Sequence, residues 1–185
     1  MKESVKSQLS TDHRNVARLL AVLGDQLDKV EQAENANFDL MTDVMHYMTT
    51  YPDQVHHRLE DLLYQTLYAQ RSEFRPMLDR MFEEHTALAD KGGALYRVLE
   101  GVVDGRMVER TELVGSGRAY VDLLRNHMIY ENEQVFPIAD DQLDAASWTD
   151  VATRFAAQRD PVFGDVQDEQ FAVLLAHIKD EAQAS

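Results

Sequence analysis

Two short stretches of this chain place a histidine and a glutamate four residues apart within apolar surroundings. The first holds His56 and Glu60 in VHHRLEDLLY, and the second holds His127 and Glu131 in NHMIYENEQVFP. Residues four apart lie on the same face of an α-helix, one turn from each other. Imidazole and carboxylate groups together suit iron, manganese or zinc. The repeated spacing therefore predicts a site for metal cations.

Two further histidines fit the same kind of site. His13 shares a helix face with Leu9, and His85 shares one with Leu88. An unpaired buried polar group costs about 1–3 kcal/mol, and a whole domain is stable by only roughly 5–15 kcal/mol, so six buried imidazole and carboxylate groups need partners. A cluster of cations supplies such partners, and each glutamate can bridge a pair of cations.

Each of these signals has an ordinary structural explanation when it stands alone. A single histidine on an apolar face is more often a core residue than a metal ligand, and a single His-x-x-x-Glu is commonly a surface pair. His177 and Glu181 repeat the spacing outside the four long helical segments, and we expect that pair not to bind metal. The ferritin-like Glu-x-x-His spacing precedes no histidine of the chain. The joint arrangement, with one histidine on each of four helices, is what favours a metal centre.

The elements that must position these residues are predicted to be helices. The chain has only 8 Gly and 4 Pro, so the turn residues that sheets need are scarce. Apolar residues recur at helical spacing over about 10–32 with Ser10 or Thr11 as the N-cap, over 38–70 with a break near Tyr51-Pro52, over 76–102, and over 108–135 with an end at Pro137. Four long helices with short loops predict an all-α, up-down-up-down four-helix bundle.

The rest of the chain carries two shorter helical patterns, at residues 147–158 and 169–182. The stretch RDPVFGDV between them is typical of a loop. We therefore predict two parts. Residues 1–140 form the bundle with the di-metal site, and residues 141–185 form a C-terminal helical extension that packs on the bundle.

Composition limits the classes of function. The 185 residues are 44% hydrophobic, which is typical of a globular domain with a real core. A net charge of −15, from 33 acidic and 18 basic residues, disfavours binding to nucleic acids or anionic membranes. The absence of cysteine excludes disulfides, thiolate zinc sites and cysteine nucleophiles. Because no apolar run is long enough for a membrane span and the N-terminal stretch MKESVKSQLSTDH is polar, we expect a cytoplasmic protein.

The joint motif resembles that of the hemerythrin-like HHE cation-binding family. Its pattern is a histidine on the first helix, His-x-x-x-Glu on the second, a histidine on the third and His-x-x-x-Glu/Asp on the fourth. The stretches YPDQVHHRLEDLLY, HMIYENEQVFP and DPVFG are similar to stretches of bacterial single-domain members, so the resemblance covers nearly the whole chain. It implies a di-iron centre, with two iron ions bridged by both glutamates and by an oxo or hydroxo group. The ligands that it implies are His13, His56, Glu60, His85, His127 and Glu131.

The chain departs from the oxygen-carrying hemerythrins at one position. Those proteins have His-x-x-x-His on the third helix, whereas here the residue four before His85 is Met81. One iron then has an open or water-filled position, unless a neighbouring residue fills it. An open position favours reaction with O2, peroxide or NO over reversible carriage of O2.

His57 is the first candidate to fill that position, and His46 and Tyr47 are weaker ones. His57 lies about 100° around the helix from His56, so it faces the centre only if the helix is distorted after Pro52. We expect it to lie beside the ligands or to be partly exposed, without binding metal directly.

The resemblance implies binding, sensing or redox handling of O2, NO or peroxide, or a role in iron homeostasis. The partner is then a small diatomic ligand or peroxide, and a di-iron peroxidase or other oxidoreductase activity is one form of this function. The alternative is a metal-free helical bundle for signalling or interaction, such as a histidine phosphotransfer module. Such a module needs one exposed reactive histidine, whereas four histidines here have the phase of the core.

Overall fold

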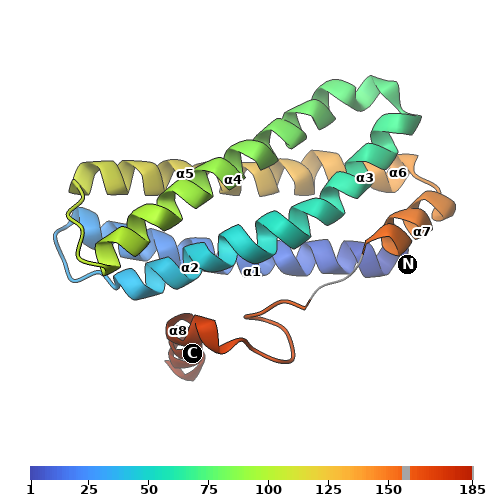
Figure 1. The fold of residues 1–185 in the computed structure, drawn as a ribbon. Helices are drawn as coiled ribbons and strands as arrows, with labels where there is room; N and C mark the ends of the chain where they lie inside the picture. Colours follow the sequence, from blue (N-terminus) through green and yellow to red (C-terminus); the bar gives the residue numbers. More distant parts are fainter. Residues whose placement is uncertain (156–158, 185) are drawn as a thin grey trace.

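The computed structural model of the chain describes residues 1–155 and 159–184, with the backbone alone for residues 181–184. Four antiparallel helical rods make up its main body (Figure 1). The first rod is α1 (Lys2–Glu31), and the second consists of α2 (Phe38–Tyr51), η1 (Pro52–His56) and α3 (His57–Gln70). The third is α4 (Arg75–Val103), which follows the short turn η2 (Ser72–Phe74). The fourth consists of α5 (Arg110–Tyr130), η3 (Glu131–Val135) and α6 (Phe136–Gln142). The described ranges contain no strand. The predicted all-α, up-down-up-down bundle is confirmed.

The second and fourth rods are each interrupted by a five-residue π-helix, η1 and η3. Pro52 begins η1, and Pro137 lies in the first turn of α6. Proline lacks the backbone N–H that would continue the helical hydrogen bonds of the preceding turn, so a rod that runs through a proline must change its turn there. The break predicted near Pro52 is therefore a widened turn within a continuous rod. The prediction that the fourth helix ends at Pro137 is wrong, because the rod continues through it to Gln142.

The first helix begins at Lys2, so the predicted start near residue 10 is wrong, as is the predicted cap at Ser10 or Thr11. No side-chain hydrogen bond caps α1 at its N-terminus. Val5 and Leu9 are instead buried in the core at this end of the bundle. Packing of an apolar face stabilises these first turns where no cap does.

The C-terminal part of the chain packs on the bundle as two separate helices. The first is α7 (Ala145–Arg154), which contacts α1 and α3 and is capped by the Asp144 carboxylate, which accepts the Ser147 N–H at 2.8 Å. The second is α8 (Ala172–Ala184), which follows the turn η4 (Glu169–Phe171) and contacts α2 (Figure 1). Both short helices agree with the sequence patterns, although residues 156–158 lie outside the described residues. A boundary at residue 140 would fall inside α6, and the two-part division stays a prediction.

A polar layer crosses the core between two hydrophobic clusters. On α1, for example, Leu9 belongs to one cluster, Val16 belongs to the other, and His13 lies between them. All four rods carry buried polar residues at this level. The layer is therefore enclosed by apolar side chains along the bundle axis.

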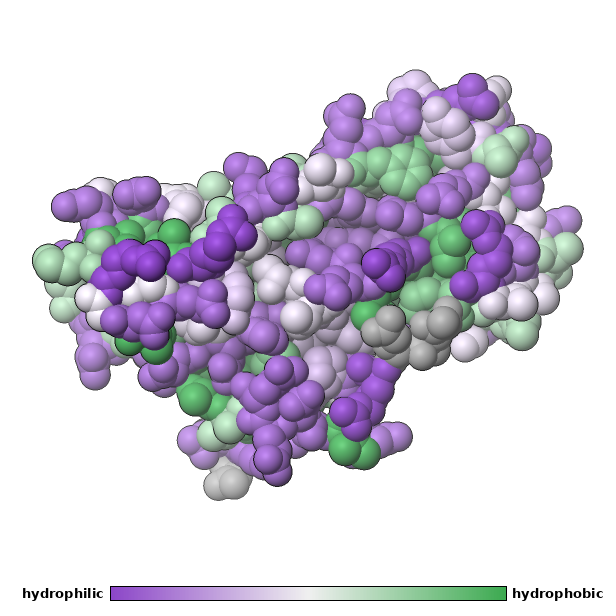
Figure 2. All heavy atoms as spheres, in the orientation of Figure 1, coloured by the Kyte–Doolittle hydropathy of each residue, from purple (hydrophilic) through white to green (hydrophobic). Residues whose placement is uncertain are grey.

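The outer surface is largely hydrophilic on the face that Figure 2 shows, as the acidic composition predicts. None of the helices in the described part of the chain has the length and apolar character that crossing a bilayer demands.

Candidate metal centre

The structure brings all six predicted site residues into the buried polar layer. Both glutamates have an exposed fraction of 0%, and the exposed fraction of the four histidines is 7% or less. The six residues come from all four rods: His13 from α1, His56 from η1, Glu60 from α3, His85 from α4, His127 from α5, and Glu131 from η3.

Glu60 is contacted by histidines on both of its carboxylate oxygens. Its Oε1 lies 3.0 Å from Nε2 of His56 and 3.4 Å from Nε2 of His13. Its Oε2 lies 3.4 Å from Nε2 of His85. Two histidines therefore gather at one oxygen and a third histidine at the other.

Glu131 repeats this arrangement. Its Oε1 lies 2.9 Å from Nε2 of His127 and its Oε2 lies 3.3 Å from Nε2 of His13. Two carboxylates thus lie between a pair of histidines, His13 and His56, and a second pair, His85 and His127. Such an arrangement suits two cations bridged by both carboxylates.

Several atoms that face the middle of the layer have no hydrogen-bond partner among the described residues. They are Nε2 of His13, His85 and His127, both carboxylate oxygens of Glu60, and Oε2 of Glu131. These atoms lie at ion-pair distances from one another but without hydrogen-bond geometry. Each unpaired buried group costs about 1–3 kcal/mol, and cations bound here would pair all of them at once. Nitrogen and carboxylate donors together suit iron, manganese or zinc, so the residues present fit a pair of such ions.

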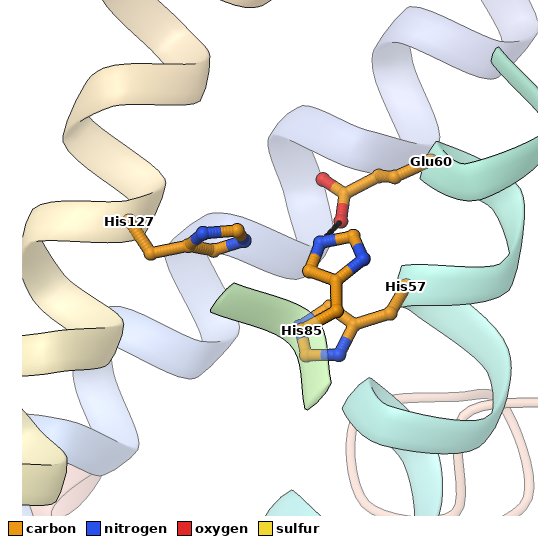
Figure 3. Close-up of side chains that lie close together, drawn as sticks. All are labelled: His57, Glu60, His85 and His127. Atoms are coloured by element: carbon orange, nitrogen blue, oxygen red, sulfur yellow. Dashed lines mark ion pairs between the residues drawn. The ribbon is translucent and has the colours of Figure 1, made fainter. Parts of the chain in front are cut away.

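His57 joins the second pair of histidines. It is 5% exposed, and its ring stacks on that of His85, with the centroids 4.2 Å apart and the planes 11° from parallel. Ligand atoms of His57, Glu60, His85 and His127 lie within 4.8 Å of one another. Figure 3 shows the stacked rings of His57 and His85 beside Glu60, with His127 opposite. A second group of this kind consists of His13, His56 and Glu60, so Glu60 belongs to both.

The π-helix η1 explains how two sequence neighbours can both face the centre. In an α-helix, neighbouring residues point about 100° apart. The wider turn of a π-helix changes this phase, and η1 ends at His56, directly before His57. The distortion after Pro52, on which an inward-facing His57 depends, is present. His57 is buried beside the candidate ligands, and whether it binds metal directly stays a prediction.

The other residues considered from the sequence lie elsewhere. Nδ1 of His46 lies 2.9 Å from the Tyr96 hydroxyl, and the Tyr47 hydroxyl donates a hydrogen bond of 3.0 Å to Asp160. His177 lies in α8, and the side chain of its partner Glu181 lies outside the described side chains. Neither His46 nor Tyr47 is part of the two donor groups.

The sequence interpretation missed the acceptors behind the histidines, that is, the side-chain oxygens that lie within hydrogen-bond distance of their Nδ1 atoms. The Nδ1 atoms lie 3.1 Å from Asp12 Oδ2 for His56, 2.8 Å from Asp61 Oδ1 for His85, 2.8 Å from Glu84 Oε2 for His127, and 3.2 Å from Asn132 Oδ1 for His13. Each acceptor is the immediate sequence neighbour of a predicted ligand, and this adjacency is the signal that could have found them. An acceptor at Nδ1 keeps the proton there and leaves Nε2 for a metal ion.

Tyr64 is a second residue that the sequence interpretation missed. It is fully buried, and its hydroxyl donates a hydrogen bond of 2.5 Å to Oε1 of Glu131. Burial, followed by the negative charge of Glu131, raises the pKa of Tyr64 well above its usual value. The phenol therefore stays protonated and acts as a donor to this carboxylate.

The carboxylates of the layer control the protonation of the histidines when no metal is bound. Burial is the largest single influence and lowers the pKa of His13 and of His85. The close carboxylates outweigh burial: Glu131 and Glu60 raise the pKa of His13 to about 10, and Asp61, Glu131 and Glu60 raise that of His85 to about 12. The same balance raises the pKa of His56 to about 9. These rings are protonated in the metal-free protein.

The pKa values of the two glutamates and of His57 are lowered instead. Burial raises the pKa of Glu60 and of Glu131, but the surrounding histidines outweigh it and hold both pKa values well below their usual range. Burial, and then the positive charge of His85, lowers the pKa of His57 well below its ordinary value. A metal ion that enters must displace protons from the other histidines, whereas His57 is already neutral.

Comparison with known proteins gives one family. The model described as "Hemerythrin HHE cation binding domain" matches residues 5–139, a range that contains all six predicted site residues and His57. No curated protein matches the chain.

Proposed function

Because the chain belongs to the hemerythrin HHE cation-binding family, we propose that its buried layer holds two iron ions bridged by Glu60 and Glu131. The observation that carries this proposal is the pair of donor groups that share Glu60. Each glutamate has histidine Nε2 atoms near both of its oxygens, so each can serve one ion with each oxygen.

The two positions differ in their nitrogen donors. One ion would be held by His13 and His56, and the other by His85, His127 and His57. We propose His57 as a ligand, in place of the non-binding role expected from the sequence, because it is buried, stacked on His85 and neutral. It would supply, from the second rod, the nitrogen that oxygen carriers take from a fifth histidine on the third helix, where this chain has Met81.

The proposed role is binding, sensing or redox handling of O2, NO or peroxide, or a part in iron homeostasis. An iron pair supplies electron transfer and a binding position for such small molecules. The chain contributes the bridging carboxylates, the orientation of the imidazoles, and two apolar clusters that enclose the layer. With two histidines instead of three, the His13 and His56 position has the fewer protein donors, and an added small ligand fits there best.

The burial of the histidines favours this proposal over a histidine phosphotransfer module. The reactive histidine of such a module must reach a phosphoryl donor on another protein. The five histidines of the layer are exposed by 7% or less, and four of them contact acceptors at Nδ1.

Elemental analysis of the purified protein, together with its near-ultraviolet absorption, tests the proposal. We expect about two iron ions per chain after loading with Fe(II) in air, and an absorption band of an oxygen-bridged iron pair. A folded protein that takes up no metal would contradict the proposal. Phosphorylation of the protein on histidine by a phosphodonor would support the alternative.

A further inference from the structure

The acceptors behind the histidines form a closed ring around the bundle. Each rod supplies one acceptor to a histidine of the next rod: Asp12 of α1 to His56 of η1, Asp61 of α3 to His85 of α4, Glu84 of α4 to His127 of α5, and Asn132 of η3 to His13 of α1. The last contact, from Asn132 to His13, returns to α1, the rod from which Asp12 makes the first contact. None of these contacts lies within one rod, so the ring connects every rod to both of its neighbours.

Helix geometry explains why the ring closes. Each acceptor directly precedes or follows a proposed ligand of its own rod, as Asp12 precedes His13 and Asp61 follows Glu60. Residues that are neighbours in a helix point about 100° apart. When the ligand points to the bundle axis, its neighbour therefore points sideways, toward the adjacent rod.

Two of the acceptors each receive a further hydrogen bond on their other carboxylate oxygen. The Gln8 side chain donates a hydrogen bond of 2.8 Å to Oδ1 of Asp12, and Arg80 donates one of 2.7 Å to Oε1 of Glu84. In each case the other carboxylate oxygen accepts from a histidine. These carboxylates therefore have little freedom to turn away from the histidines that they serve.

On these contacts, and resting on the proposed di-iron function, we propose that Asp12, Asp61, Glu84 and Asn132 are positioning residues, and that Asn132 makes the His13 and His56 position the more readily emptied of the two. A carboxylate accepts only, so it fixes the proton of its histidine on Nδ1 and leaves Nε2 for the metal ion. The amide of Asn132 can also turn and donate. With the amide turned, the proton of His13 lies on Nε2, where it blocks metal binding.

The surroundings of Asn132 also indicate that it positions His13 weakly. Asn132 is exposed, whereas the exposed fraction of Asp12 is 2%. Asn132 also has no negative charge with which to strengthen a hydrogen bond from Nδ1–H. The histidine of α1 thus has the weakest support in the ring, and its position lacks the third histidine that the other position has.

The pairing within the ring can be tested on the zinc-loaded protein, in which nitrogen NMR of labelled histidines shows each Nδ1–H separately. For Glu84→Gln we expect the His127 signal to move and the zinc affinity of one position to fall about tenfold. The matched control is Glu83→Gln, which removes the same charge from an exposed neighbour on α4. Equal effects of the two changes, or a shift of a different histidine, would overturn the ring.

The order of release can be tested by transferring zinc to a chelator and following its two phases. Asn132→Asp should slow the faster phase by about tenfold, and Glu84→Gln should speed the slower phase. The control Gln134→Glu adds the same charge at an exposed position of η3 and should change neither phase. If Gln134→Glu acts like Asn132→Asp, the effect is one of general charge and the inference fails. A wild-type protein that binds no zinc or iron would instead overturn the proposed function on which the ring depends.

Discussion

Glu60 is the residue through which the two donor groups are joined. It is fully buried, it belongs to both groups, and neither of its oxygens has a hydrogen-bond partner among the described residues. A change that keeps the shape of this side chain but removes its charge should therefore affect both ions together.

We expect Glu60→Gln to weaken binding of both ions by more than the 10–100-fold that loss of an orienting partner typically costs. The measurement is metal content after dialysis against a weak chelator. Glu133→Gln, at an exposed position of η3, is the matched control and should keep two ions per chain. A Glu60→Gln protein that retains one ion at full affinity would show that this carboxylate is not shared.

In the proposed centre, His57 decides whether the two positions have unequal numbers of nitrogen donors. We expect His57→Ala to weaken one ion by more than about 100-fold and to leave the other nearly unchanged, because His57 lies only in the group with His85 and His127. His46→Ala is the control, since His46 bonds to Tyr96 away from the layer. Titration with Co(II), read from its visible absorption, follows the two positions separately. Unchanged affinity in His57→Ala would restore the role beside the ligands that the sequence predicts.

Spacing along the chain predicted that the six candidate residues lie together, but not which side chains contact their Nδ1 atoms. His56 and Glu60 share a helix face by arithmetic alone. By contrast, the contact of Asp12 with His56 depends on how two rods are rotated about their axes. The inward turn of His57 likewise depends on η1, and a π-helix has no signal in the hydrophobic spacing.

At the scale of elements, the rods must pack closely enough for donors from four of them to meet. Gly117 of α5 is one place where this packing leaves no room for a side chain. A Cβ there would lie 2.6 Å from Cδ2 and 2.8 Å from Cδ1 of Leu27, which is fully buried on α1. Gly115 lies two residues earlier on the same helix, and a Cβ added there would lie in open space.

The two glycines give a matched pair of variants. We expect Gly117→Ala to destabilise the protein by about 1–3 kcal/mol, because the added methyl overpacks the contact between α1 and α5. Gly115→Ala should stabilise it by up to about 1 kcal/mol, because alanine is the better helix former. Chemical denaturation of both variants provides the test. Equal changes in the two would mean that α1 and α5 can separate at little cost.

The elements that the sequence predicted best are those with a sustained helical period, such as α4. The errors lie at the ends, for different physical reasons. α1 starts earlier than predicted because Val5 and Leu9 gain burial against distant parts of the chain. The fourth rod passes Pro137 because the π-helix η3 ends just before it, at Val135, and the proline lies in the first turn of α6. Tertiary contacts set the start of α1, and the local helix type lets the fourth rod pass Pro137. The spacing of apolar residues along the chain contains neither kind of information.

At the scale of the whole molecule, the polar layer makes stability depend on what occupies it. In the metal-free protein, protonated histidines surround two ionised glutamates in the middle of the core. With the proposed metal ions bound, cations would replace those protons. The two forms should therefore respond to pH in different ways.

The sign of that response follows from the pKa shifts. The pKa values of His56, His13 and His85 rise on folding to about 9, about 10 and about 12. Their contribution to stability is complete below the unfolded value near 6.5 and is lost as the pH rises through the folded values. The glutamates have lowered pKa values, so their contribution is lost only when the pH falls below about 4.5. These histidines and glutamates together stabilise the metal-free protein most between about pH 4.5 and 6.5.

We therefore expect the free energy of unfolding of the metal-free protein to fall between pH 6.5 and 9, by about 1.4 kcal/mol per pH unit for each proton that the folded state retains. The zinc-loaded protein should not lose stability in this way, because its histidines carry metal instead of protons and binding strengthens as protons become scarcer. Urea unfolding at several pH values, with zinc and with a chelator, measures both curves. The repulsion within a chain of net charge −15 is present in both forms, so their difference isolates the polar layer. Parallel curves would mean that the layer does not exchange protons for metal.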